Sequence, residues 1–403
     1  MNHKTTTLIM AGTAHGLVHL LMLSLPYITV KLLQVTPVLP GQEALIVILL
    51  NTPSYFVFGL GAIPAGVLCD RIGPTKTIAI GLFLAVCSGI GLFFLWPLGI
   101  GTIALFFILY SFGAGLYHPA GTTWVSNTFQ ENRGKALGRH GIGGSIGQAS
   151  APILSALILS TIFWSAIFLV LALIGCIVAF VILRIRLTPT EVQESLHSDK
   201  KPSTTFFAAM TPLVFVVMSL VLITRGMLYR GTVTALPTYI TIELQALLVL
   251  AGLFGTLVYI GGAVGQEVGG RLTDRIGWQF TLFIMCVLSV FSLLLLSMPY
   301  SPNLLSDLLL IISVLLFGFS FFSAQAATNT MVADLSTSSN RGSVFGWSFF
   351  ARFGMGAFGI TIAGMMQFLY GTWAMGFLMM AILGLLAALF VPLVRSRYEK
   401  VDT

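Results

Sequence analysis

Two histidines near the start of the chain, His15 and His19, lie four residues apart inside a long apolar stretch. On an α-helix this spacing places both imidazoles on one face. An imidazole is costly to place in a bilayer, so it ordinarily faces a cavity or a partner. A cavity-lining substrate or proton site is therefore favoured, with structural hydrogen bonding and metal binding as alternatives. The spacing could also bind zinc, but no glutamate lies between the two histidines to act as a base, so a metalloprotease is disfavoured and no metal ligand is assigned.

Basic and amide side chains form a second group of candidates. Arg352 is placed well inside an apolar run, whereas the acidic residues fall near the ends of such runs. A cavity with cationic but no central anionic groups favours an anionic or zwitterionic ligand. Together with the two histidines, the candidate substrate-binding residues are His118, Arg225, Gln325, Asn329 and Arg352.

Some of these cations have an alternative role in gating. Arg225 and Arg230 are expected towards the outer end of the seventh apolar run, where they could pair with Glu243 as an outer gate. Arg139 lies at the start of the fifth run and could cap an inner gate.

The elements that must position these residues are membrane helices. Of the 403 residues, 57% are hydrophobic and only 8% are charged, whereas soluble proteins average about 25% charged residues. A helix needs about 20 apolar residues to cross a bilayer. Twelve runs meet this length, near residues 6–33, 43–69, 75–96, 100–126, 136–160, 163–185, 207–235, 246–270, 279–299, 304–331, 342–369 and 372–394.

The twelve runs form two sets of six around one polar stretch. We predict six-helix bundles at 1–185 and 207–403, joined by a cytoplasmic linker at 186–206 that contains prolines and alternating charge. Lys and Arg gather on the linker's side of the membrane, which predicts that both termini are cytoplasmic. The net charge of +7 therefore reflects topology. Nucleic-acid binding is not predicted, since the basic residues are not clustered in a stripe.

Short motifs recur in the two halves. The pattern Gly-x-Leu-x-Asp-Arg-x-Gly occurs at 66–73 and again at 270–277. Asn-Arg-Gly occurs at 132–134 and again at 340–342. Parallel repeats of this kind are typical of one class of secondary transporter.

The motif at 66–73 resembles the signature that the major facilitator superfamily carries between its second and third helices. The resemblance implies an all-α membrane protein with twelve transmembrane helices in two pseudo-symmetric six-helix bundles, which work by alternating access. It places gates at the motif residues and their repeats. The predicted gating residues are Asp70, Arg71, Arg133, Arg139, Asp274, Arg275 and Arg341.

The segment 113–121, which contains His118 and Pro119, looks like bacterial proteins akin to the fosmidomycin-resistance exporters. Those proteins share a His-Pro pair ending the fourth helix and a His-rich first helix. The resemblance implies efflux from the bacterial inner membrane. A coupling proton would use histidine, whose ordinary pKa is near 6.5. The glycines at 141, 144 and 147 predict close helix packing, since the strand of a dinucleotide-binding motif is missing.

The sequence thus predicts a monomeric secondary transporter in the lipid bilayer, without a cofactor, that moves a small organic anion, zwitterion or drug, with proton-coupled antiport as the efflux mechanism. A uniporter or an anion exchanger is the alternative. An integral membrane enzyme is less favoured, because the sequence shows no nucleophile–base pair, metalloprotease motif or phosphate loop. A channel is a further, less favoured alternative, which single-channel recordings would distinguish from a carrier.

Overall fold

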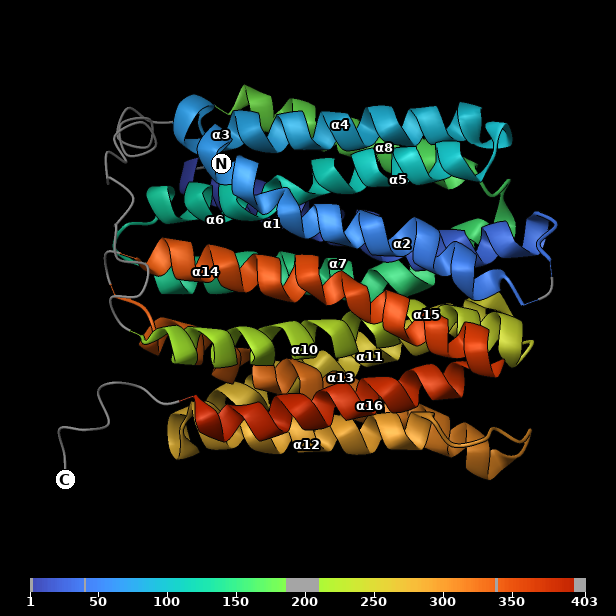
Figure 1. Ribbon diagram of the computed structural model, residues 1–403. Coiled ribbons are helices and arrows are strands. Elements are labelled where there is room, and N and C mark those ends of the chain that lie inside the picture. Colours follow the sequence, from blue (N-terminus) through green and yellow to red (C-terminus); the bar gives the residue numbers. More distant parts are fainter. Residues whose placement is uncertain (1–2, 40, 186–209, 338–339, 395–403) are drawn as a thin grey trace. The chain divides into compact units, whose positions relative to one another are not determined.

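The computed structural model describes residues 3–39, 41–185, 210–337 and 340–394, except the side chains at 133, 134, 341 and 342 (Figure 1). Within these residues, twelve helical segments are long and apolar enough to span a membrane. The predicted all-helical fold with twelve membrane helices is therefore confirmed. The predicted linker, 186–206, lies outside the described residues.

The chain divides into two compact units, residues 1–37 with 49–200 and residues 38–48 with 201–403. The helices that precede the linker are α1 (His3–Val35), α2 (Glu43–Leu60), α3 (Ala62–Ile72), α4 (Pro74–Leu95), η1 (Trp96–Leu98), α5 (Ile100–Gly115), α6 (Tyr117–Thr128), α7 (Arg133–Thr161) and α8 (Ala166–Arg184).

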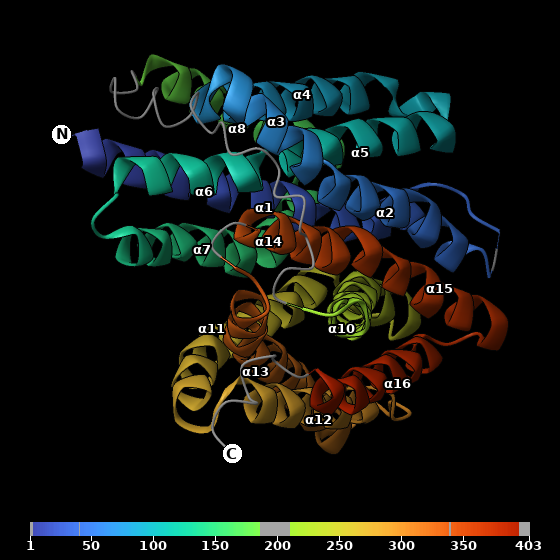
Figure 2. The same cartoon turned by 60° about the vertical axis from the view of Figure 1, so that its left-hand side comes forward.

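The helices after the linker include two short π-helical segments, η2 and η3. In chain order they are α10 (Pro212–Thr238), η2 (Tyr239–Glu243), α11 (Leu248–Ile276), α12 (Trp278–Leu296), α13 (Leu304–Asp334), α14 (Arg341–Phe349), η3 (Phe350–Gly354), η4 (Met355–Ala357), α15 (Phe358–Tyr370), α16 (Trp373–Phe390) and η5 (Val391–Leu393). In this unit α11 packs along α13, and α13 packs against α12 (Figures 1 and 2).

The fourth membrane helix is interrupted where the sequence predicts a continuous run at 100–126. It breaks at Leu116 into α5 and α6, and His118 lies in the first turn of α6. Pro119 explains the break, since it has no N–H to donate to the Gly115 carbonyl four residues earlier. The His-Pro pair therefore lies within the membrane span and does not end it, because the helix continues to Thr128.

The eleventh membrane helix is also not the continuous helix that the sequence predicts at 342–369. After α14 the backbone widens into the π-turn η3, which contains Arg352, and then tightens into η4 before α15. Such π-turns inside α-helices occur frequently at functional sites. Hydrophobic periodicity does not reveal a single widened turn, so the position of Arg352 on the turn comes from the structure alone.

The repeated motif has the same backbone conformation in both units. Gly73 ends α3 with φ 87° and ψ 161°, and Gly277 ends α11 with φ 80° and ψ 158°. A positive φ is readily adopted only by glycine. The next helix begins directly after each glycine, at Pro74 and at Trp278. The sequence repeat is thus a structural repeat of the same sharp turn.

Glycines also bring α1 and α7 into backbone contact within the first unit. A Cβ atom added to Gly143 would overlap the carbonyl of Gly12, and one added to Gly147 would overlap the carbonyl of Gly16. Small residues at four-residue spacing are the usual means by which membrane helices approach closely. The predicted close packing is therefore confirmed at Gly144 and Gly147 but not at Gly141, where an added Cβ meets nothing within 4 Å.

Gly147→Ala is expected to lower the stability of the purified protein by about 1–3 kcal/mol, the usual cost of overpacking a well-packed site. The matched control is Gly141→Ala on the same helix, where an added Cβ meets nothing within 4 Å. That change should leave stability unchanged or raise it by about 0.5–1 kcal/mol, because alanine favours the helix. Equal melting temperatures for the two variants in detergent would show that the close approach is not essential.

Candidate functional site

Three histidines from two helices meet inside the first unit. His15 and His19 extend from α1, and their Nε2 atoms lie 3.2 Å apart. His118, on α6, places its ring edge-on to both, with centroids 5.2 Å from His15 and 5.4 Å from His19. His19 is buried, and the other two rings are half-buried. The structure thus brings together the three histidines that the sequence singled out; we call them the histidine cluster.

Neighbouring residues on α6 and α7 hold the rings of this cluster in place. The ring of His140, on α7, stacks on His15 at 4.5 Å, and its carbonyl oxygen accepts a hydrogen bond from His15 Nδ1 at 3.4 Å. The Tyr117 hydroxyl donates to the Ala11 carbonyl, so it accepts from His140 Nε2 at 2.7 Å. Gly144 leaves room for the His15 ring, which a Cβ there would meet at 2.5 Å.

His140 and Tyr117 are not among the site residues that the sequence predicts. Tyr117 adjoins His118 in the motif, which is a signal that could have identified it. His140 is far from His15 along the chain, so only the contact between α1 and α7 reveals its position.

In the second unit, Arg225 lies near the middle of α10 and not towards its outer end as predicted. Its guanidinium donates to the carbonyls of Phe321 and Ala324 and to the hydroxyl of Thr328, all on α13. Glu243 lies about 27 Å further along the helix axis, at 1.5 Å per residue. The alternative of an Arg225–Glu243 ion pair is therefore wrong.

Glu243 instead fixes the start of α16. Its carboxylate accepts from the Thr372 hydroxyl at 2.6 Å and from the Trp373 backbone N–H at 2.7 Å. A carboxylate at a helix N-terminus is stabilised by the unpaired amides and by the helix dipole.

Arg352 reaches α13 from the π-turn η3. Its Nε donates to the Ser348 carbonyl at 3.2 Å, and its Nη1 lies 3.5 Å from the Asn329 side-chain oxygen. Asn329 also accepts from Gln325 Nε2 at 3.4 Å. The backbone of η3 presses against α10, because a Cβ on Gly226 would overlap the Arg352 carbonyl. Arg225 and Arg352 thus both reach the turns of α13 that carry the other two predicted binding residues of this half.

Aromatic rings alternate with the arginines. The guanidinium of Arg225 lies 5.1 Å from the Phe321 ring, which stacks on Tyr229 at 4.4 Å and 10°. The Phe353 ring lies 5.3 Å from Arg230 and 5.9 Å from Arg352. Cations over ring faces are stabilised by the ring quadrupole. We call the three arginines with Phe321, Tyr229 and Phe353 the arginine cluster.

The hydrogen-bond partners of Arg225 and Arg352 described above are all neutral. Carbonyl, hydroxyl and amide oxygens orient a guanidinium but do not neutralise it. A positive charge inside a bilayer is costly without compensation. The arrangement can therefore attract and hold an anionic group, and Arg352 is the better placed arginine because its side chain is half-buried whereas that of Arg225 is buried.

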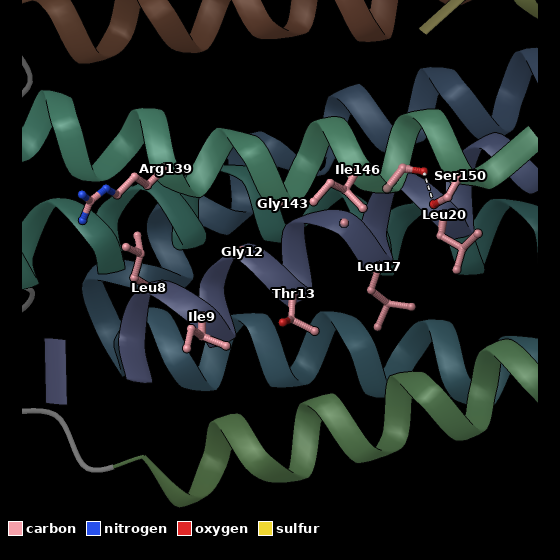
Figure 3. Close-up of a pocket in the computed structure, with 12 residues that line it drawn as sticks. Leu8, Ile9, Gly12, Thr13, Leu17, Leu20, Arg139, Gly143, Ile146 and Ser150 are labelled. Carbon is pink, nitrogen blue, oxygen red and sulfur yellow. Dashed lines mark hydrogen bonds between the residues drawn. The ribbon is translucent and has the colours of Figure 1, made fainter. Parts of the chain in front are cut away.

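A groove runs along α1 and α7 in the first unit (Figure 3). Its volume is about 500 Å³, and most of its lining is apolar. Arg139 lies at one end beside Leu8, and Ser150 and Leu20 lie at the other (Figure 3). The three residues of the histidine cluster do not line this groove.

The predicted gating residues lie at helix ends. Asp70 and Arg71 are exposed in the last turn of α3, and Asp274 and Arg275 are exposed in the last turn of α11. The side chains of Arg133 and Arg341 lie outside the part of the chain that the structure describes.

Two compact helical units with twelve candidate membrane spans, each with a cluster of polar groups on its helices, define a multi-pass helical membrane protein. The sequence matches the Major Facilitator Superfamily over residues 7–360, and the chain belongs to this family. Family membership makes it a transporter of a small solute and not an enzyme.

Individual relatives are more distant. The riboflavin transporter RibZ of Clostridioides difficile (strain 630) is 32% identical over 184 residues, which cover 45% of this chain and 38% of that protein. The chain therefore matches well under half of that relative's length.

Solved structures of similar fold cover nearly the whole chain. A bacterial homologue of the human lysosomal transporter Spinster, in its inward-facing unoccupied form, gives a TM-score of 0.75 at 13% identity, over 98% of this chain and 97% of that one. A mutant form of the nucleoside transporter NupG gives 0.78 at 14% identity, over 98% and 100%. At these identities the likeness shows the fold alone.

Thr328→Val is expected to lower the free energy of unfolding by about 1.5–3 kcal/mol. The change removes the Thr328 hydroxyl, which is the side-chain acceptor among the contacts described above for the buried Arg225 guanidinium. The matched control is Thr330→Val on the same helix, whose hydroxyl donates to the Ala326 carbonyl at 3.2 Å. Thermal unfolding in detergent should show a larger loss for Thr328→Val. Equal losses would mean that the Arg225 contact adds nothing to stability.

Proposed function

We propose that this transporter carries a small organic anion or zwitterion, and that the arginine cluster binds its acidic group. The observation that carries the proposal is the pair Arg225 and Arg352, two guanidinium groups oriented by neutral oxygens along the same turns of α13. An acidic ligand supplies the charge compensation that these partners do not.

The two arginines take different parts in the proposed site. Arg225 is tied to three acceptors on α13 and is buried, so it supplies a fixed positive field. Arg352 has longer contacts and is half-buried, so its guanidinium can turn to a ligand. A carboxylate or phosphate accepts two parallel hydrogen bonds from such a fork, which gives both affinity and orientation.

The rings beside the arginines suit an apolar or planar portion of the same solute. Phe321 and Phe353 each lie within 6 Å of a guanidinium, so a bound molecule can place its charge on the cation and its carbon skeleton on the ring. Binding sites for small molecules commonly combine apolar walls with a few oriented polar groups. The partial similarity to a riboflavin transporter supports an organic cargo.

The proposal extends to direction and location. The resemblance to fosmidomycin-resistance exporters supports proton-coupled export from the bacterial cytoplasmic membrane, and the distribution of Lys and Arg supports cytoplasmic termini. We assign gating to the exposed Asp70–Arg71 and Asp274–Arg275 pairs and to Arg133, Arg139 and Arg341. A uniporter or an anion exchanger for a metabolite remains the alternative, and it differs in needing no proton gradient.

Membrane vesicles of known orientation test direction, coupling and gating together. We expect inside-out vesicles to accumulate the cargo when a proton gradient is imposed and to lose this accumulation when an uncoupler is added. Asp70→Asn should slow the flux without weakening cargo binding. Glu267→Gln is the matched control, since Glu267 is exposed and pairs with Arg271 on the surface of α11. Accumulation that survives the uncoupler would contradict proton coupling and favour exchange or facilitation.

Cargo binding tests the role of Arg352 directly. Purified protein is screened for thermal stabilisation by small carboxylates and organic phosphates, and the best ligand is titrated against variants. Arg352→Gln should weaken its binding about 10–100-fold, which corresponds to a charge-assisted hydrogen bond of about 1.5–3 kcal/mol. Arg352→Lys should also weaken binding, because lysine keeps the charge but loses the planar fork.

The matched control for Arg352 is Arg271→Gln, which removes an arginine with 71% side-chain exposure from the same unit. This variant should bind the ligand as the parent protein does. Arg352→Gln should melt no lower than the parent in the absence of ligand, since it removes a charge from the membrane interior. If the Arg352 variants are stabilised by the ligand as strongly as the parent, the anion site lies elsewhere.

A further inference from the structure

The histidine cluster has the dimensions of a metal site. One ring nitrogen from each of His15, His19 and His118 lies within 4.8 Å of the others. Two imidazoles bound to one tetrahedral zinc ion at about 2.0–2.1 Å hold their nitrogens about 3.3 Å apart. The Nε2 atoms of His15 and His19 are already at 3.2 Å. From this geometry we propose that His15, His19 and His118 bind zinc or another late first-row divalent metal ion.

The surroundings of His15 prepare it as a ligand. The hydrogen bond from its Nδ1 to the His140 carbonyl, at 3.4 Å, favours the tautomer with the proton on Nδ1, because a carbonyl only accepts. The Nε2 of His15 therefore has a lone pair that points towards His19. A ligand histidine in metalloproteins almost always donates its other ring N–H to a carbonyl or carboxylate in this way. His140 is itself fixed by Tyr117, so the orienting carbonyl is rigidly placed.

The donor set selects the class of ion. Three neutral imidazoles suit zinc, nickel, cobalt and copper, whereas magnesium and calcium prefer oxygen ligands. Three protein ligands leave the fourth tetrahedral position open, as in catalytic zinc sites. Because imidazoles add no negative charge, a water, hydroxide or anionic oxygen in that position lowers the cost of a divalent cation inside the membrane.

This site does not depend on the proposed transport of an organic anion. It shares no residue with the arginine cluster, and its test reads metal binding without any transport step. It goes beyond the proton or substrate role expected for His15 and His19, since in the metal-bound state their nitrogens are occupied by the ion.

The test uses full-length protein purified without a polyhistidine tag and titrated with Co²⁺, whose visible d–d absorption reports tetrahedral coordination, and with Zn²⁺ by calorimetry. We expect one ion of either metal per chain. His19→Gln and His118→Gln should each weaken binding by at least about 10–100-fold. A loss of this size already follows removal of a residue that only hydrogen-bonds to a metal ligand. The matched control, His3→Gln, changes a histidine of α1 outside the cluster and should bind as the parent does.

A second variant keeps the test decisive if a glutamine variant does not fold. His19→Cys retains a ligand atom and should add the ultraviolet thiolate-to-cobalt charge-transfer band to the Co²⁺ spectrum, whereas His3→Cys should not. The proposal is overturned if the parent binds no ion above the background of nonspecific surface binding. It is equally overturned if folded His19→Gln and His118→Gln bind as tightly as the parent, or if His19→Cys adds no such band.

Discussion

Close contact between helix backbones is the constraint on which both polar clusters depend. In the first unit, Gly143 and Gly147 let α7 touch the carbonyls of α1, and this contact carries His140 to His15. In the second unit, Gly226 lets α10 touch the backbone at Arg352. Side chains at these glycine positions would push the helices apart, and the polar groups would no longer reach one another.

The two units stabilise polar groups among their membrane helices by different interactions. In the first unit, the His15 ring stacks on His140 and on Tyr117, and its Nδ1 donates to the His140 carbonyl. Imidazole can be neutral, so this arrangement needs no counter-charge. The arginines of the second unit keep their charge and are oriented by neutral oxygens and aromatic rings. A charge held in this way attracts a ligand of opposite sign.

Two of the interrupted membrane helices lie at these clusters. The break at Leu116 lies two residues before His118, and the π-turn η3 contains Arg352. Interruptions of a membrane helix leave backbone groups to be satisfied by neighbours, so they are tolerated only where other protein groups surround them. Their coincidence with the candidate ligands indicates that each interruption sets the direction of a functional side chain.

The sequence by itself determined the membrane class, the twelve spans, the half-repeat and the family. These follow from composition, run length and a motif whose turn glycines, Gly73 and Gly277, have no substitute at positive φ. It also identified His15 and His19 as neighbours, because a four-residue spacing fixes a helix face. All of this information is local to the chain, or repeats along it.

Only the tertiary structure decided which distant side chains meet. The approach of α6 and α7 to α1 brings His118 and His140 to His15, and α13 receives both Arg225 and Arg352. The sequence placed Arg225 towards the outer end of its helix and allowed a pair with Glu243, and both were wrong. The reason is physical: helix ends shift by several residues when a π-turn or an N-cap contact extends them, and the rotation of one helix against another is set by which glycines let the backbones touch.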